Sequence, residues 1–182
     1  MGLHAHTGSG ILTPEVWQET ALFLTGFLED FPQVRYLNLG GGLGIPEQPQ
    51  QEGLDLSLLD AELAQVKQGF PGVEFWLEPA RFLVTQADVL LAPITQVKTK
   101  NEETFIGIAT GMNSLIRPAP HGSYHFAANL TRLHELKTRL ANIVGPICES
   151  GDTLAFSRLL PETIGGKFLI APFRPYQNEI MS

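Results

Sequence analysis

Residues 36–42 read YLNLGGG, and this stretch decides the fold. An apolar run that ends in three glycines predicts a short buried strand followed by a tight turn. Similar runs lie on both sides of it: residues 2–6 read GLHAH before TGSG, and residues 73–77 read VEFWL before Glu78. The strand ends at His6, Gly40 and Glu78 are 34 (6 to 40) and 38 (40 to 78) residues apart, about one βαβ unit.

Two amphipathic helices are expected between these strands. Thr13 and Pro14 suit a helix start, and a helical face follows with apolar residues at steps of three and four, ending before Pro32: Trp17, Ala21, Leu24, Leu28 and Phe31. A second helix is expected from about Ser57 to Pro71. Strand–helix alternation predicts an α/β fold with a parallel sheet, whose chemistry lies at the carboxyl ends of the strands.

A closed (β/α)8 barrel needs eight such units, and three are present, so we expect a partial barrel over residues 1–83. From residue 84 to 182 the apolar runs are β-branched and separated by Gly and Pro, which predicts a mostly β domain.

Composition limits the function classes. A net charge of -7 argues against nucleic acid, and no apolar run reaches the ~18 residues that span a membrane. The N-terminus has no signal-peptide pattern, and Cys148 is the only cysteine, so we expect a cytoplasmic protein. His4 and His6 lack further ligands, so we expect no metal site.

Several residues can carry chemistry, although each also has a purely structural interpretation. The glycines at 40–42 can bring backbone N–H groups to a phosphate, or simply form a turn. His6 can stack on a flat ring and Ser9 can bind phosphate, while Glu78 can hold a protonated ring nitrogen or pair with Arg81.

Two later motifs are candidates as well. Arg117 can clamp a carboxylate, and Cys148 beside Glu149 suits a proton donor better than a nucleophile, because nearby negative charge opposes the thiolate.

The order of five strings gives these signals specificity: HAHTGSG, LNLGGGLGIP, EPAR, GMNSLIRP and GPICESGD. Their series resembles the fold-type III pyridoxal-phosphate (PLP)-dependent amino-acid decarboxylases, and within them the diaminopimelate decarboxylases, from residue 2 to about residue 162. The resemblance implies PLP as cofactor and loss of CO2 from an amino-acid substrate, with L-lysine made from meso-diaminopimelate.

The resemblance also implies a role for each cofactor-binding residue. His6 would stack on the PLP ring, Glu78 would pair with the pyridine nitrogen, and the phosphate would be held by a set of small residues and one tyrosine: Ser9, Gly40, Gly41, Gly42 and Tyr176.

Substrate contacts follow in the same way. Arg81 and Arg117 would hold the substrate carboxylate, and His121 occupies the place of a substrate-binding Tyr in the family. Cys148 would protonate the carbanion and Glu149 would contact the distal end of the substrate, both in the active site of a second subunit, so the resemblance implies a homodimer with shared active sites.

The chain departs from the family in one important respect. The lysine that binds PLP as a Schiff base lies early in the family's barrel, in a motif like Y-A-x-K-A, and this chain starts at about the sixth strand. The chain is therefore expected to be either an incomplete piece of a longer enzyme or half of a split one, in which a complementary N-terminal chain would supply the lysine. Residues 126–143 carry leucines at helical spacing, whereas the family has strand and loop there, and we follow the family.

Two hypotheses from different classes remain. The chain is part of a working decarboxylase, for diaminopimelate or else for ornithine, arginine or carboxynorspermidine. Alternatively it is a non-catalytic remnant that serves as a dimerisation or ligand-binding module.

Overall fold

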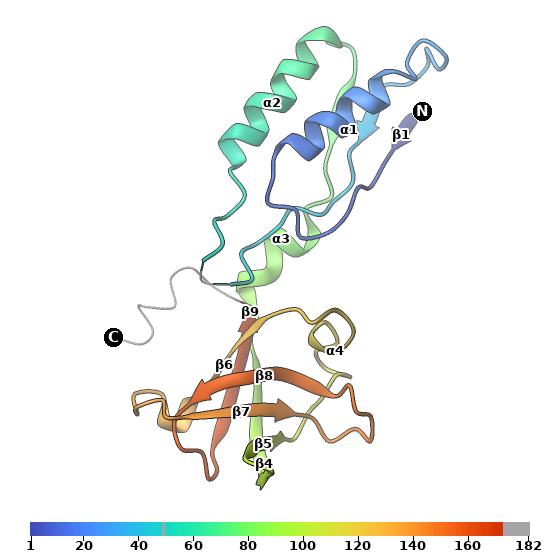
Figure 1. Ribbon diagram of the computed structural model, residues 1–182. Helices are drawn as coiled ribbons and strands as arrows, with labels where there is room; N and C mark the ends of the chain where they lie inside the picture. The colour runs from blue at the N-terminus through green and yellow to red at the C-terminus, as the bar shows by residue number, and fades with distance from the viewer. Residues whose placement is uncertain (49, 173–182) are drawn as a thin grey trace. The chain divides into compact units, whose positions relative to one another are not determined.

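The computed structural model describes residues 1–48 and 50–172, which form two compact units (Figure 1). The first unit comprises Met1–Pro46 and Gln50–Thr85, and the second comprises Glu47–Pro49 and the chain from Gln86 onward. None of the helices in these ranges is both long enough and apolar enough to cross a membrane.

The first unit alternates short parallel strands with helices. Its strands pair in the order β1-β2-β3, with Gly2 beside Tyr36 and Tyr36 beside Glu74. The carboxyl ends of all three strands therefore lie at one edge of the sheet. The elements are β1 (Gly2–His4), α1 (Glu15–Thr25), β2 (Tyr36–Asn38), α2 (Leu56–Gly69), β3 (Glu74–Trp76) and α3 (Ala80–Val84).

The core of this unit lies between the sheet and the two longer helices. Trp17 of α1 is fully buried, as are Leu37 and Leu39 at β2. Burying a side chain of this kind contributes about 1.5–3 kcal/mol. Asp55 caps α2, because its Oδ1 accepts hydrogen bonds from the N–H groups of Ser57 (2.9 Å) and Leu58 (3.0 Å).

Helix α1 is shorter than the sequence predicts, since it ends at Thr25 and not near Phe31. Gly26 is a poor helix former, and after it the chain tightens: the Phe27 N–H donates to the Leu24 carbonyl and the Leu28 N–H to the Thr25 carbonyl. Leu28 still packs against the core from this turn. The helical spacing therefore identified the buried face as far as Leu28 but not the end of the helix, and it was wrong for Phe31, which is 38% exposed.

The second unit is a six-stranded sheet in the order β6-β9-β4-β5-β7-β8, in which only β5 and β7 pair in parallel. Short helical segments connect the strands. The elements are η1 (Thr85–Ala87), β4 (Leu90–Lys100), β5 (Glu103–Ile108), α4 (Pro118–His121), β6 (His125–Asn129), η2 (Leu130–Arg132), β7 (Arg139–Val144), β8 (Thr153–Leu160) and β9 (Lys167–Pro172).

This sheet curls into a nearly closed barrel, because its end strands β6 and β8 approach one another. A side chain links them: Arg158 of β8 donates from Nη2 to the carbonyl of His125 in β6 at 3.4 Å. A bulge precedes Arg158, where Ser157 has a φ of 48° and the pairing with β7 shifts register. Ile106, Ile143 and Phe168 fill the interior and are 0–1% exposed.

The predicted fold class is confirmed: three parallel βα units precede a mostly β unit. The family interpretation of residues 126–143 also agrees with the structure, which has strand, loop and strand there. Of the leucines at helical spacing, only Leu130 lies in the short η2 turn, and Leu140 lies in β7. Leu136 and Leu140 are 83% and 60% exposed.

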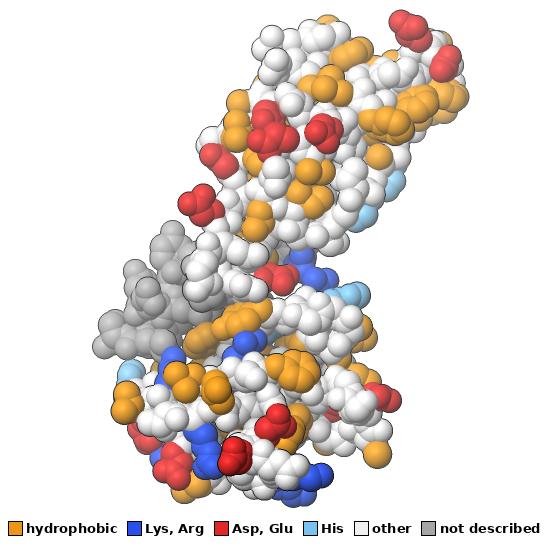
Figure 2. Space-filling view, viewed as in Figure 1, with side chains coloured by type: hydrophobic (Ala, Val, Ile, Leu, Met, Phe, Trp, Pro, Cys, Tyr) orange, Lys and Arg blue, Asp and Glu red, His pale blue; other side chains and the backbone are white. Residues whose placement is uncertain are grey.

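Charge is distributed unevenly between the units on the face that Figure 2 shows. On the face shown in Figure 2, Lys and Arg lie mainly over the second unit, and the first unit carries mostly Asp and Glu. The first unit also exposes Leu22 and Phe23 of α1 and Phe27 of the turn that follows it, which are 54%, 63% and 39% accessible.

His125 is the buried histidine of the second unit. Burial lowers the pKa of His125 below its ordinary value of 6.5, and the positive charges of Arg117 and Arg158 lower the pKa further. The Ser123 carbonyl and Glu47 oppose these effects without cancelling them. Because the unfolded chain binds a proton more readily than the folded one, stability is full above about pH 6.5 and is lost as the pH falls towards the lowered pKa.

We therefore expect His125→Gln to flatten the pH dependence of unfolding between pH 7 and pH 5. One proton changes the free energy of unfolding by at most about 1.4 kcal/mol per pH unit. Urea unfolding at several pH values measures the slope, with His134→Gln, at an exposed position, as the matched control. An unchanged slope in His125→Gln would show that this histidine does not govern the acid sensitivity.

Candidate functional site

The parallel pairing of the first unit continues past the strands, and this brings three loops together. Its extra backbone bonds are Ala5 N–H to Asn38 O (3.0 Å), Leu39 N–H to Trp76 O (2.9 Å) and Glu78 N–H to Gly40 O (2.9 Å). Residues directly after each strand are therefore held side by side, as the sequence predicts for the carboxyl ends of parallel strands.

A cavity of about 260 Å³ opens at this edge. Its lining includes six of the residues singled out from the sequence, from all three loops and the start of α3: His6, Ser9, Gly41, Gly42, Glu78 and Arg81. Gly40 lies behind the lining, where its carbonyl accepts the bond from Glu78.

His6 is fixed by a backbone group of the second loop. The N–H of Gly41 donates to His6 Nδ1 at 3.1 Å. Since Nδ1 accepts this bond, the neutral ring carries its proton on Nε2. The imidazole is exposed towards the cavity, where a flat ring could stack on it.

The glycine loop has two N–H groups in internal use. Gly40 donates to Asn38 Oδ1 at 2.9 Å and Gly41 donates to His6, whereas no acceptor among the described residues takes the N–H of Gly42. Gly42 also has a φ of 88°, and a Cβ there would lie 2.1 Å from the carbonyl oxygen of Gly8. A side chain would thus force the glycine loop away from the loop that carries Gly8.

Glu78 is oriented by the second strand. Asn38 Nδ2 donates to Glu78 Oε1 at 2.7 Å, and His4 Nε2 lies 3.9 Å from the same oxygen. The second carboxylate oxygen has no partner in the described part of the chain, so it can accept a proton-bearing nitrogen.

These groups fit a phosphorylated aromatic cofactor. The glycine loop supplies a free N–H and the loop after β1 supplies the Ser9 hydroxyl for a phosphate. The imidazole of His6 offers a stacking face, and Glu78 offers an anion for a ring nitrogen. No lysine lines the cavity in the described residues. Lys67, the lysine of helix α2, donates to the Val73 carbonyl and lies over the Phe75 ring.

The remaining predicted residues belong to the second unit. Arg117 precedes α4, donating from Nη2 to Ser123 Oγ at 3.2 Å with Glu47 Oε1 3.9 Å from that nitrogen. His121, at the end of α4, and both Cys148 and Glu149 are exposed. Tyr176 lies outside the described residues.

The sequence did not show how the two loops that carry Arg117 and Cys148 are joined. Asp152 is 3% exposed, and its Oδ1 accepts from the Met112 N–H (2.6 Å) while its Oδ2 accepts from the Ile147 N–H (2.8 Å). One carboxylate therefore ties the GMNSLIRP loop to the GPICESGD turn. The signal that the sequence offered was the glycine at position 111, because a Cβ there would collide with the Asp152 carboxylate.

Arg158 was also missed. Its guanidinium lies over the Tyr124 ring, 3.8 Å from the centroid, and bonds the His125 carbonyl. It thereby holds the segment that follows α4. The bulge at Ser157 turns Arg158 towards this segment, and no motif in the sequence marks that bulge.

Asp152→Ala should destabilise the second unit by about 2–4 kcal/mol, because two backbone N–H groups lose their acceptor. Asp152→Asn keeps one acceptor oxygen and should cost less. Chemical denaturation measures both losses, with Glu103→Ala at an exposed position as control. Equal stability of Asp152→Ala and the control would mean that the carboxylate does not hold these loops.

Comparison with known proteins identifies the family. The model of the pyridoxal-dependent decarboxylase C-terminal sheet domain matches residues 33–172. Diaminopimelate decarboxylase of Methanothermobacter thermautotrophicus is 36% identical over 93% of this chain and 42% of its own length. The Escherichia coli enzyme of the same name is 33% identical, over 93% and 44%.

Solved structures agree with these relatives. Diaminopimelate decarboxylase from Helicobacter pylori, complexed with L-lysine, superposes with a TM-score of 0.80 at 25% identity, covering 94% of this chain and 43% of that one. AQ1208 from Aquifex aeolicus gives 0.78 at 32% identity, covering 94% and 43%. The chain thus spans less than half the length of these relatives. It belongs to the pyridoxal-dependent decarboxylase family.

Proposed function

We propose that this chain is the C-terminal portion of a PLP-dependent diaminopimelate decarboxylase, which converts meso-2,6-diaminopimelate to L-lysine. The observation that carries the proposal is the single cavity lined by His6, Gly42 and Glu78, one residue from each strand end. The relatives named diaminopimelate decarboxylase support the choice of substrate over ornithine, arginine or carboxynorspermidine.

PLP, when bound, would accept the electron pair that remains on the substrate after CO2 leaves. The N–H of Gly42 and the hydroxyl of Ser9 would hold its phosphate. Gly40 and Gly41 would act indirectly, since their N–H groups position Asn38 and His6. His6 would stack on the ring.

Glu78 would keep the ring nitrogen protonated. Its Oε1 is already held by Asn38 at 2.7 Å, which restrains the carboxylate at the cavity wall. A carboxylate fixed in this way binds a pyridinium more strongly than a mobile one, because little side-chain freedom remains to be lost. This makes the ring a better electron acceptor.

Arg81 and Arg117 would bind the substrate carboxylate, and His121 would take the place of the family's substrate-binding Tyr. Cys148 and Glu149 are exposed at a turn, as contributions to the active site of a second subunit require. We infer a cytoplasmic homodimer on this basis, with Cys148 delivering the proton and Glu149 contacting the distal end of the substrate.

A complementary N-terminal segment would supply the missing lysine. Helix α1 and the turn after it expose Leu22, Phe23 and Phe27, and β1 pairs with only one neighbour, β2, in the described sheet. An apolar helix face and an open strand edge are features that further βα units would cover.

Equilibrium dialysis of PLP against the 182-residue chain tests the cofactor site. We expect Glu78→Gln to weaken PLP binding roughly tenfold, since a charge-assisted bond is replaced by a neutral one. Gly42→Ala should weaken it further, because its Cβ meets the Gly8 carbonyl. Glu52→Gln, exposed in the same unit, is the control.

PLP binding that is indifferent to Glu78→Gln would reject this cofactor site and favour the non-catalytic module. Decarboxylation is tested separately by adding an N-terminal half that bears the lysine. Lysine should form from diaminopimelate only in the mixture, and turnover by the chain alone would contradict the need for that lysine.

A further inference from the structure

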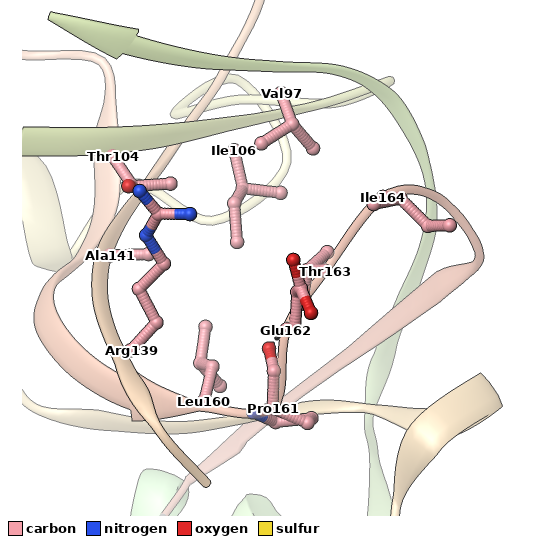
Figure 3. Close-up of a pocket in the computed structure, with 10 residues that line it drawn as sticks. All are labelled: Val97, Thr104, Ile106, Arg139, Ala141, Leu160, Pro161, Glu162, Thr163 and Ile164. Carbon is pink, nitrogen blue, oxygen red and sulfur yellow. Dashed lines mark hydrogen bonds between the residues drawn. The ribbon is translucent and has the colours of Figure 1, made fainter.

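A second cavity, of about 330 Å³, lies inside the barrel of the second unit (Figure 3). Strands β4, β5, β7 and β8 and the loop from β8 to β9 form its walls. It shares no residue with the cavity at the strand ends of the first unit.

The floor of this cavity is apolar. Ile106, Ala141 and Leu160 are 1–4% exposed and line it together with Val97. These are aliphatic side chains from four different strands, and the buried threonines Thr104 and Thr163 line the cavity beside them. The aliphatic part of the floor suits a hydrocarbon chain.

Opposite charges flank the floor. Arg139 projects from β7, and Glu162 projects from the loop on the other side of the hollow, with the apolar side chains between them (Figure 3). The described residues form no ion pair with either of these two side chains, which are both exposed at the mouth. Each therefore retains its capacity to bind a charged group of a ligand.

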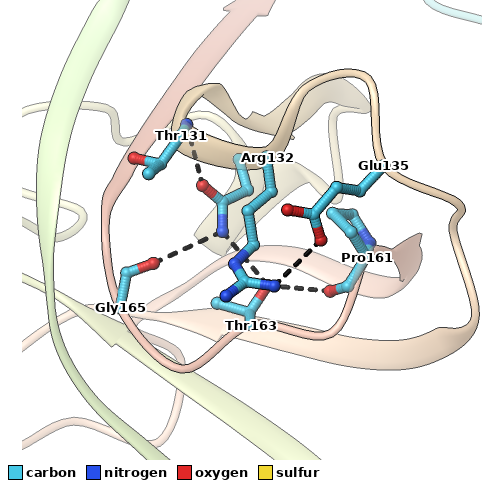
Figure 4. A network of polar contacts seen from close by, with 7 residues as sticks. Thr131, Arg132, Glu135, Pro161, Thr163 and Gly165 are labelled. Carbon is cyan, nitrogen blue, oxygen red and sulfur yellow. Dashed lines mark hydrogen bonds and ion pairs between the residues drawn. The ribbon is translucent and has the colours of Figure 1, made fainter.

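The wall that carries Glu162 is fixed from behind. Asn129, 1% exposed, donates from Nδ2 to Thr163 Oγ1 at 3.3 Å and to the Gly165 carbonyl at 3.5 Å, and its Oδ1 accepts the Thr131 N–H at 3.1 Å (Figure 4). Thr163 in turn donates to the Pro161 carbonyl at 2.9 Å. This buried network holds the loop in shape, so the cavity is pre-formed.

We propose that this cavity binds a linear ω-amino carboxylate, with its carboxylate on Arg139, its ammonium on Glu162 and its methylene chain over the apolar floor. The charges stand on opposite walls, so a ligand must carry its own charges at opposite ends. An α-amino acid with an aliphatic side chain, whose charges are adjacent, reaches only one wall. The site goes beyond the proposed decarboxylase activity and does not depend on it.

The probe is 6-aminohexanoate, titrated into the 182-residue chain by isothermal calorimetry. We expect saturable binding, and at least tenfold weaker binding of hexanoate, hexylamine and L-leucine. Each of these three compounds can place a charged group on Arg139 or on Glu162 but not on both. Absence of 6-aminohexanoate binding, or equal binding of hexanoate or hexylamine, would overturn the proposal.

Variants at the mouth locate the site. Arg139→Gln and Glu162→Gln should each weaken 6-aminohexanoate binding roughly tenfold, and Lys98→Gln and Glu103→Gln, exposed on the neighbouring β4–β5 hairpin, should leave it unchanged. The double variant Arg139→Glu with Glu162→Arg should recover binding, because the probe can turn end for end. Binding that survives both single variants would place the probe elsewhere and reject the site.

Discussion

The parallel register of β1, β2 and β3 is the constraint on which the strand-end site depends. Side chains alternate between the two faces of a sheet, so a slip of one residue would turn each functional side chain to the other face. The register is held along the strands and again beyond them, by the bond from the Glu78 N–H to the Gly40 carbonyl. His6, Gly42 and Glu78 can line one cavity because these backbone bonds hold the loops in register.

Close approach of the loops explains why glycine is needed at all three positions of this turn, since a Cβ at Gly40 would lie 2.6 Å from the Ala5 carbonyl oxygen. A Cβ at Gly41 would lie 2.6 Å from the Glu78 carbonyl, and one at Gly42 would meet Gly8. In the same turn, the N–H groups of Gly40 and Gly41 donate to the side chains of Asn38 and His6. The glycine loop therefore has two duties: Gly40 and Gly41 position neighbouring side chains, and Gly42 alone offers a free donor to a ligand.

Much of this arrangement could be predicted from sequence, because strand ends, glycines and helical periodicity are local signals. The chemistry-bearing residues of the first unit lie where YLNLGGG and its neighbours indicate. Features set by contacts between distant segments could not be predicted. The leucines from 130 to 140 have helical spacing, yet strands on both sides take this stretch into the sheet and leave Leu136 exposed. The bulge at Ser157 likewise has no characteristic residue pattern that would mark it in the sequence.

The second unit differs physically from the first in how its loops are held. In the first unit, backbone bonds fix the functional loops, whereas in the second unit side chains from other strands do so. Asp152 joins two loops with one buried carboxylate, and Arg158 reaches from β8 to the carbonyl of His125 and the ring of Tyr124. A loop without ladder bonds has unsatisfied N–H and carbonyl groups, and a buried charge can satisfy several at once. Such an anchor is effective but also vulnerable, because removing one side chain releases both segments that it joins.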